Sequence, residues 1–298
     1  MQLGQRGKVY SAGDAASLDT ALEDILDRVK PDVLAINGGD GTVHVVLTAA
    51  MNRLRPGQEL PFIQVLPGGT MNTVSGGYGV RGPMLGIFGH SAETWLARLL
   101  KHTSVDDVPH VRRHLLRVEG SEQVQYGFLF GNGLISNFLE VYYDGAEPTP
   151  AKALLILGRG ILSSFIQGAA IRRLMRPVDV AVEADGIPWP YARYLSVAAG
   201  TSDDIGFGFR VFFRVLQAPG RMHAVGIACS AFAFVLELPR ILRSRPMKNP
   251  RVVDLTPSEL RLRGETDLVY MIDGDFHRAG REVTVTTSVE LRLGTPPA

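Results

Sequence analysis

The sequence predicts an α/β protein of two domains, and three observations support this. Up to about residue 100, short apolar runs typical of buried strands alternate with segments of helical periodicity. Beyond that point, short strand-like segments separated by turns predominate. The chain has 298 residues, which is enough for two domains of moderate size. We expect an α/β domain with a parallel sheet over 1–104. A mainly antiparallel domain with helical insertions is expected over 105–298. The last strand of this second domain is a candidate to return to the first domain.

The N-terminal domain is expected to alternate strands and helices. Its first helix follows from apolar residues at helical spacing between Leu18 and Val29, with Ser17 as the capping residue and Pro31 as the stop. Two later apolar runs have the pattern of strands that are buried on both faces of a parallel sheet. The predicted elements are, in order, strand 8–10, helix 17–29, strand 33–36, helix 42–53 and strand 62–66.

The C-terminal domain contains many short strand candidates, separated by turns, and two helical segments. The helical segments cover 152–176 and 227–243. The strand candidates cover 111–119, 124–130, 139–143, 178–184, 193–199, 221–226, 259–263, 268–272, 283–287 and 289–293.

Composition excludes several classes of protein. Hydrophobic residues make up 45% and charged residues 20% of the chain, so a packed core is expected and a disordered chain is not. The net charge of +1 gives no indication of a nucleic-acid partner. The one cysteine, Cys229, rules out an internal disulfide or a multi-thiolate metal site, and we expect it to be a small buried residue in a reducing compartment.

No segment of the sequence is typical of a membrane span. The longest uncharged apolar run, 224–236, falls short of the roughly 18 residues that a span needs. The N-terminus also lacks the apolar core of a signal peptide. We therefore expect a cytoplasmic protein whose contact with a membrane is peripheral, at its inner face.

A glycine-rich segment lies between the second predicted strand and the second predicted helix. Glycines let a backbone approach a ligand closely, and N–H groups at the start of a helix attract phosphate. A plain tight turn would explain the glycines alone, but Asp40 next to a phosphate requires a metal ion or a proton-donating substrate to offset its charge. The candidate nucleotide-binding residues are Asn37, Gly38, Gly39, Asp40, Gly41 and Thr42, the last also a candidate helix cap.

A second glycine-rich segment follows the next buried strand. In a parallel sheet both segments lie at the carboxyl edge, where ligands bind in open α/β sheets. Two such loops at neighbouring strand ends are more informative than one. The second loop adds Pro67, Gly68, Gly69, Thr70 and Asn72 to the candidate nucleotide site.

Gly-Gly-Asp-Gly-Thr at 38–42 and Pro-Gly-Gly-Thr-Met-Asn at 67–72 together resemble the diacylglycerol kinase catalytic-domain family, which includes bacterial diacylglycerol kinases, sphingosine kinases and ceramide kinases. The resemblance covers most of the chain. It implies a Rossmann-like N-terminal domain similar to those of phosphofructokinases and NAD kinases, and a C-terminal β-sandwich domain. It also implies ATP and Mg²⁺, a lipid hydroxyl as acceptor and, from the bacterial relatives, a homodimer.

Two carboxylates near the C-terminus are candidates for catalysis. Asp273 and Asp275 flank Gly274 after a predicted strand, although Asp-Gly is also a common hairpin turn. The resemblance matches Asp273 to the family's catalytic aspartate and puts Asp275 where the family usually has the longer glutamate. Phosphoryl transfer needs one carboxylate to accept the proton of the attacking hydroxyl, and Mg²⁺ takes one or two others. Asp40 and Asp273 are the candidates for base and metal ligand, and the residues leave open which has which role.

Two basic segments without acidic residues point to contact with an anionic membrane surface. They cover 152–176 and 238–253, where lysine and arginine are interleaved with apolar residues. The alternative is a buried helix with a solvated basic end. His44, near the first glycine loop, is expected to have a surface or packing role.

The sequence departs from the family in four places. The family's first strand, with its Asn-Pro-x-x-Gly-like loop, has no counterpart, and Thr73 stands where many bacterial diacylglycerol kinases have aspartate. Residues 199–204 replace an Asn- and Gly-rich stretch. Residues 216–221 stand where many bacterial relatives have an acidic turn for a structural Mg²⁺, so no second metal is expected.

Three functions compete, and the lipid kinase leads. An NAD kinase-like small-molecule kinase shares the first glycine loop, but it does not explain the second loop or the basic segments. A catalytically degenerate family member that binds lipid or nucleotide fits the missing first strand. The retained residues Asp40, Thr70, Asn72 and Asp273 argue against it.

Overall fold

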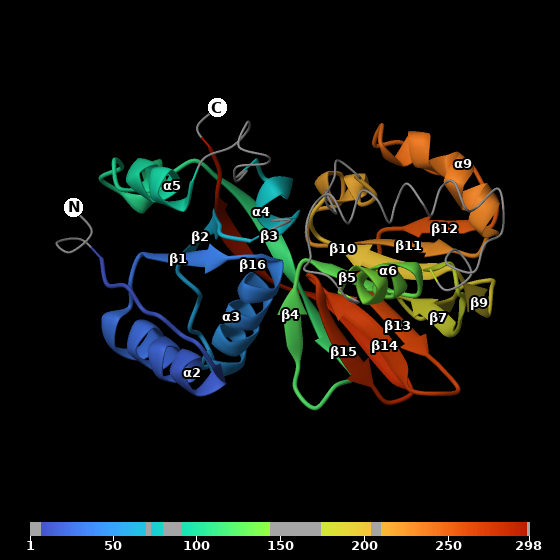
Figure 1. The fold of residues 1–298 in the computed structure, drawn as a ribbon, viewed down its shortest axis with the longest axis horizontal. Helices are drawn as coiled ribbons and strands as arrows, with labels where there is room; N and C mark the ends of the chain where they lie inside the picture. Colours follow the sequence, from blue (N-terminus) through green and yellow to red (C-terminus); the bar gives the residue numbers. More distant parts are fainter. Residues whose placement is uncertain (1–6, 70–72, 80–90, 144–173, 204–209, 297–298) are drawn as a thin grey trace.

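The computed structural model describes residues 7–69, 73–79, 91–143, 174–203 and 210–296, which form two packed units (Figure 1). In the N-terminal unit, strands and helices alternate after the first helix, as the apolar patterns predict. Helices α2 and α3 lie on one side of its strands and α5 on the other (Figure 1). The elements are α2 (Ala15–Glu23), the π-helix η1 (Asp24–Val29), β1 (Val33–Gly38), α3 (Asp40–Arg53), β2 (Phe62–Pro67), α4 (Thr73–Gly77) and α5 (Ala92–Leu99).

The described chain before α2 forms no strand, so the predicted strand at 8–10 is wrong. Instead, the side chains of Lys8 and Tyr10 both hydrogen-bond to the carboxylate of Asp24. Helix α2 begins earlier than predicted because Asp14 is its N-cap and accepts a hydrogen bond from the Ser17 N–H at 2.8 Å. Ser17, the predicted cap, completes the capping box by accepting from the Asp14 N–H at 3.1 Å.

One eight-stranded sheet joins the two units. β1 and β2 are parallel, and the neighbour of β2 is the last strand of the chain, β16 (Glu282–Gly294), which runs parallel to it where Leu293 faces Ile63. Figure 1 shows β16 passing from the C-terminal unit to the N-terminal strands. From β16 the sheet continues through β13 (Glu259–Arg263), β7 (Ala181–Ala184) and β8 (Ile187–Pro188), and β3 (His110–Glu119) pairs with both β16 and β4 (Gln125–Gly127).

A second, six-stranded sheet is antiparallel and completes the C-terminal unit. Apolar side chains of both sheets form one cluster, in which Tyr270 and Val285 are fully buried. The parallel strands of the N-terminal unit and this antiparallel sheet confirm the predicted fold class. The strands of the second sheet lie in the order β12 (Val252–Leu255), β11 (His223–Ile227), β10 (Ser196–Gly200), β5 (Leu129–Asn132), β14 (Leu268–Ile272) and β15 (Asp275–Ala279). A separate two-stranded sheet pairs β6 (Val178–Asp179) with β9 (Arg193–Tyr194).

The predicted strand at 139–143 is wrong, because these residues end the helix α6 (Leu134–Tyr143). Gly133 has a φ of 61°, and its carbonyl accepts hydrogen bonds from the Ser136 hydroxyl at 3.0 Å and the Asn137 N–H at 2.8 Å, which starts the helix. Of the predicted helix at 152–176, all but the last three residues lie outside the described part of the chain.

Two further segments differ in detail from the expectation. The predicted helix at 227–243 forms as α9 (Ala231–Ile241), with the Ser230 hydroxyl accepting from the Ala233 N–H at its start. The strands predicted at 283–287 and 289–293 are one strand, β16, whose register shifts between Thr287 and Glu290. The shift is a β-bulge, and it interrupts the apolar alternation that suggested two strands.

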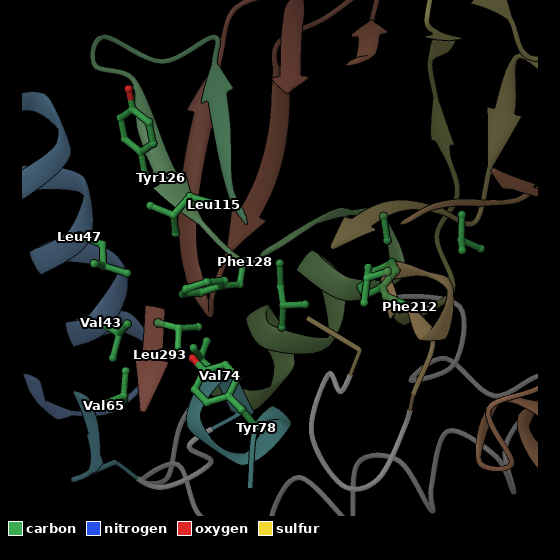
Figure 2. Close-up of a cluster of buried hydrophobic side chains, with 14 of the residues drawn as sticks. Val43, Leu47, Val65, Val74, Tyr78, Leu115, Tyr126, Phe128, Phe212 and Leu293 are labelled. Carbon is green, nitrogen blue, oxygen red and sulfur yellow. The ribbon is translucent and has the colours of Figure 1, made fainter. Parts of the chain in front are cut away.

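The two units share a hydrophobic core. Figure 2 shows Val43 and Leu47 of α3 together with Leu115, Phe128 and Leu293, and all of them belong to one buried cluster. Cys229 is also buried in this cluster, as predicted. Among the described helices, none has the length and apolar character needed to cross a bilayer.

Candidate active site

The two glycine loops lie side by side at the carboxyl ends of β1 and β2. Gly38 pairs with Pro67 at the end of the strands, and the Gly68 N–H donates to the Gly38 carbonyl at 3.2 Å. A Cβ at Gly68 would lie 2.6 Å from Asn37 Oδ1, and a Cβ at Gly39 would lie 3.2 Å from the Cα of Gly69. The backbones therefore approach so closely that side chains are excluded, which explains the glycines in both loops.

Asp40 connects the first loop to the helix that follows the second loop. It is half-buried in the first turn of α3, and its Oδ1 accepts a hydrogen bond of 2.8 Å from the Val74 N–H of α4. The cap of α3 is Gly39, without a side-chain hydrogen bond, so the prediction of Thr42 as the cap is wrong. The exposed Thr42 instead lies against Gly38. Thr70 and Asn72 lie outside the described residues.

Asp273 is a buried carboxylate in the hairpin between β14 and β15. Positive φ angles of 46° at Asp273 and 97° at Gly274 fit the type I′ turn that Asp-Gly favours. The Asp273 side chain is 2% exposed and accepts hydrogen bonds from the N–H groups of Phe128, at 3.1 and 3.0 Å, and Leu129, at 2.8 Å. Burial raises the pKa of Asp273 well above its usual value, and the charges of Asp40 and Asp275 raise it further, although the two N–H groups oppose this.

Asp275 lies against the start of α3. A Cβ at Gly41 would lie 2.9 and 3.1 Å from its two carboxylate oxygens, so this carboxylate contacts the first glycine loop directly. The position is favourable for an anion because the N-terminus of a helix carries positive partial charge. Asp275 is half-buried, and burial raises its pKa. The fold therefore brings Asp40, Asp273 and Asp275 together from opposite ends of the chain.

Tyr78 lies beside these carboxylates, and no pattern in the sequence predicts this position. Its side chain is 7% exposed, and its hydroxyl has no hydrogen-bond partner among the described residues. Burial raises the pKa of Tyr78 well above its usual value, and the charges of Asp273 and Asp40 add to the effect. Figure 2 shows its ring beside Val74, one helical turn earlier. No local pattern marks Tyr78 in the sequence, because the contact depends on where α4 packs.

Two histidines contact each other beside the hairpin. His44 of α3 is 1% exposed, and its Nδ1 lies 2.8 Å from the Tyr126 carbonyl oxygen, so its expected packing role is confirmed and a surface role is not. Its Nε2 lies 3.1 Å from Nε2 of His277 on β15. Burial and, to a smaller extent, the charge of His44 together lower the pKa of His277 to about 4, although Asp275 opposes the shift. Both rings are therefore neutral near pH 7.

Asp273→Ala should destabilise the protein more than Asp275→Ala. The first change removes the acceptor for the buried N–H groups of Phe128 and Leu129, which costs about 1–3 kcal/mol. The Asp275 carboxylate accepts no hydrogen bond among the described residues, so its removal should lower the free energy of unfolding by less. Urea denaturation of the two variants measures both values. Equal losses would show that Asp273 does not hold the junction between β4 and β5.

Acid should destabilise the folded protein through His277. Its pKa falls from 6.5 to about 4 on folding, so between these pH values the unfolded chain binds a proton that the folded chain does not. The free energy of unfolding should therefore fall from pH 6.5 towards pH 4, and less so in His277→Phe. The groups that face His277 are His44, Asp275 and the stacked ring of Tyr270. Denaturation at pH 7 and pH 5 tests this, and equal pH dependence in both proteins would contradict it.

Comparison with known proteins agrees with these features. Residues 6–99 match the model of the diacylglycerol kinase catalytic domain, and no curated protein matches the chain. A solved diacylglycerol kinase from Bacillus anthracis str. Sterne is similar over 96% of this chain and 84% of that chain, with a TM-score of 0.60 and 16% identity.

Two other structures from the same strain, whose names mark that activity as provisional, have TM-scores of 0.60 with 16% and 14% identity. In both comparisons the similar region includes 96% of this chain. It includes 84% of the first of those chains and 85% of the second. At these identities the likeness shows a shared fold. The match to the family model is independent of it and spans both glycine loops. Residues 6–99 therefore resemble the diacylglycerol kinase catalytic domain, and the rest of the chain shares the fold of the solved structures.

Proposed function

We propose that this protein is an ATP- and Mg²⁺-dependent lipid kinase that transfers the γ-phosphate to a hydroxyl of diacylglycerol, a sphingoid base or a related lipid. The observation that carries the proposal is the meeting of two glycine loops with the carboxylates of a distant hairpin at one edge of the parallel strands. The match of residues 6–99 to the diacylglycerol kinase catalytic domain supports a kinase, and the lipid acceptor and the nucleotide are the proposed parts.

The glycine loops suit the phosphates of a nucleotide. Gly38, Gly39 and Gly68 leave the backbone without side chains at the strand ends, and α3 begins directly after Gly39. N–H groups in the first turn of a helix have no partner within the helix and, with the helix dipole, favour an anion. We therefore assign the phosphates to this edge.

Mg²⁺ fits the residues at this edge. Asp40 offers the carboxylate oxygens that Mg²⁺ prefers. Burial and, after it, the negative charges of Asp40 and Asp275 raise the pKa of Asp273, and a divalent ion would relieve this repulsion. The described part of the chain holds no group of three or more metal-binding side chains. Mg²⁺ usually binds one or two carboxylates together with substrate phosphates, so such a group is not required. When bound, the ion would neutralise phosphate charge.

Asp275 is our candidate for the base that accepts the proton of the lipid hydroxyl. Asp273, a candidate from sequence, is 2% exposed and holds two backbone N–H groups, so its position suits orienting the hairpin. Asp275 is half-buried beside the phosphate loop and has a raised pKa, which suits a general base. Asp40 then lies on the nucleotide side.

A test of the activity incubates the protein with radiolabelled ATP, Mg²⁺ and separate micelles of diacylglycerol, sphingosine, ceramide and monoacylglycerol. We expect label in one lipid product, and Asp275→Asn should lower turnover by about 10²-fold, as for loss of a general base. Asp106→Asn is the control, because Asp106 is an exposed carboxylate paired with Arg292.

The alternatives give different outcomes in the same assay. Label transferred to NAD in a parallel tube, and to no lipid, would support the small-molecule kinase. ATP binding without transfer to any acceptor would support the catalytically degenerate member. Unchanged turnover in Asp275→Asn would exclude Asp275 as the base.

We also propose that α9 contacts an anionic bilayer. Its outer face carries Leu236, 60% exposed, followed at helical spacing by Pro239 and Arg243. Leu242 and Arg245, at the end of the helix, are also exposed. The acidic residue of the helix, Glu237, is buried and accepts a hydrogen bond from the Lys248 N–H, so the exposed charge here is positive. Apolar side chains flanked by arginine suit anionic headgroups.

Sedimentation with vesicles tests this contact. The protein should bind vesicles that contain an anionic phospholipid more strongly than neutral ones, and the double change Arg243→Gln and Arg245→Gln should weaken binding. Arg28→Gln is the control, since Arg28 is 71% exposed on the N-terminal unit. Equal binding to neutral and anionic vesicles would contradict the proposal.

A further inference from the structure

The histidine pair connects the two parts of the candidate active site. His277 follows Asp275 by two residues on β15, so both side chains point to the same face of the strand. His44 lies one turn into α3, whose first residues form the glycine loop. The two rings are in edge contact, with centroids 5.0 Å apart and planes at 74°. The contact therefore spans from the hairpin to the loop.

The hydrogen-bond partners of the two histidine rings determine which ring nitrogen carries the proton. The Tyr126 carbonyl can only accept, so Nδ1 of the neutral His44 carries its proton and Nε2 is an acceptor. The neighbouring Nε2 of His277 must then donate. The His277 ring also stacks on Tyr270, at 5.5 Å and 23°, which holds its plane. The pair is thus a directed hydrogen bond and not only a packing contact.

The same helix also holds the strand that binds Asp273. The Tyr126 carbonyl accepts from both His44 and the Thr48 hydroxyl, and the Tyr126 N–H donates to that hydroxyl at 3.0 Å. Two residues later, the N–H of Phe128 donates to Asp273. The hairpin is therefore attached to α3 along two routes, one through β4 and one through His277.

We propose that His277, through its hydrogen bond to His44, is a positioning residue that holds Asp275 against the first glycine loop for phosphoryl transfer. This inference rests on the proposed kinase activity. Hydrogen bonds from α3 to Tyr126, from Phe128 to Asp273 and from His277 to His44 form a closed circuit with the backbone between them. This circuit leaves the Asp275 carboxylate little freedom to move relative to Gly41.

The test separates the hydrogen bond from ring packing. His277→Phe keeps a ring that can stack on Tyr270 and removes the N–H, whereas His277→Gln removes the ring and keeps a donor for His44. We expect kcat to fall at least about tenfold in His277→Phe, since a misplacement of 1 Å can cost about 10²-fold. The KM for ATP should change little, and His277→Gln should recover most of kcat. His114→Phe, which removes another histidine bound to a carbonyl, should leave kcat unchanged.

Two results would overturn the inference. One is an unchanged kcat in His277→Phe. The other is an equal loss of kcat in His277→Phe and His277→Gln, which would mean that the ring and not the N–H matters.

Hydrogen exchange of backbone amides gives a readout that does not need turnover. Exchange at Phe128, whose N–H is bonded to Asp273, should be faster in His277→Phe than in the wild-type protein or His277→Gln. This result would support the positioning even if no lipid were phosphorylated, and the failure would then belong to the proposed activity alone. Unchanged exchange in His277→Phe would overturn the positioning itself.

Discussion

The buried Asp273 carboxylate is the interaction on which the arrangement of the two sheets depends. It binds the N–H groups of Phe128 and Leu129, where the chain leaves β4 of one sheet and enters β5 of the other. The backbone of Asp273 adds a bond from its own N–H to the Leu129 carbonyl. The residue here must be short, accept hydrogen bonds and tolerate positive φ, which few side chains other than aspartate and asparagine do. The same turn then presents Asp275 to the glycine loop.

The glycine loops could be predicted from sequence because their signals are local. An apolar run followed by glycines marks each strand end, and parallel pairing of β1 with β2 then requires the two loops to meet. The contact of Asp275 with Gly41 could not be predicted, because it depends on how a distant hairpin packs. The same holds for Tyr78 and His277, whose roles arise from tertiary neighbours. The helix α6 was mistaken for a strand because a short apolar run fits both periods, and only Gly133 and its hydrogen bonds decide between them.

The buried carboxylates of the candidate site carry an energetic cost. Burial raises the pKa of both Asp273 and Asp275, so holding them in their charged forms costs free energy that folding alone does not require. Tyr78 adds a buried hydroxyl without a partner among the described residues, which is a further cost. Such costs concentrate where a ligand later supplies the missing partners.

The course of β16 has a consequence for how the protein is made. The strand beside β2 is formed by residues 282–294, so the sheet that carries both glycine loops lacks an inner strand until these residues are synthesised. An N-terminal fragment would expose β2 as an unpaired edge, which invites aggregation. Pairing over such a sequence distance is also slow, because a long loop must close first. The edge that carries the two glycine loops is therefore completed only after residues 282–294 have been synthesised.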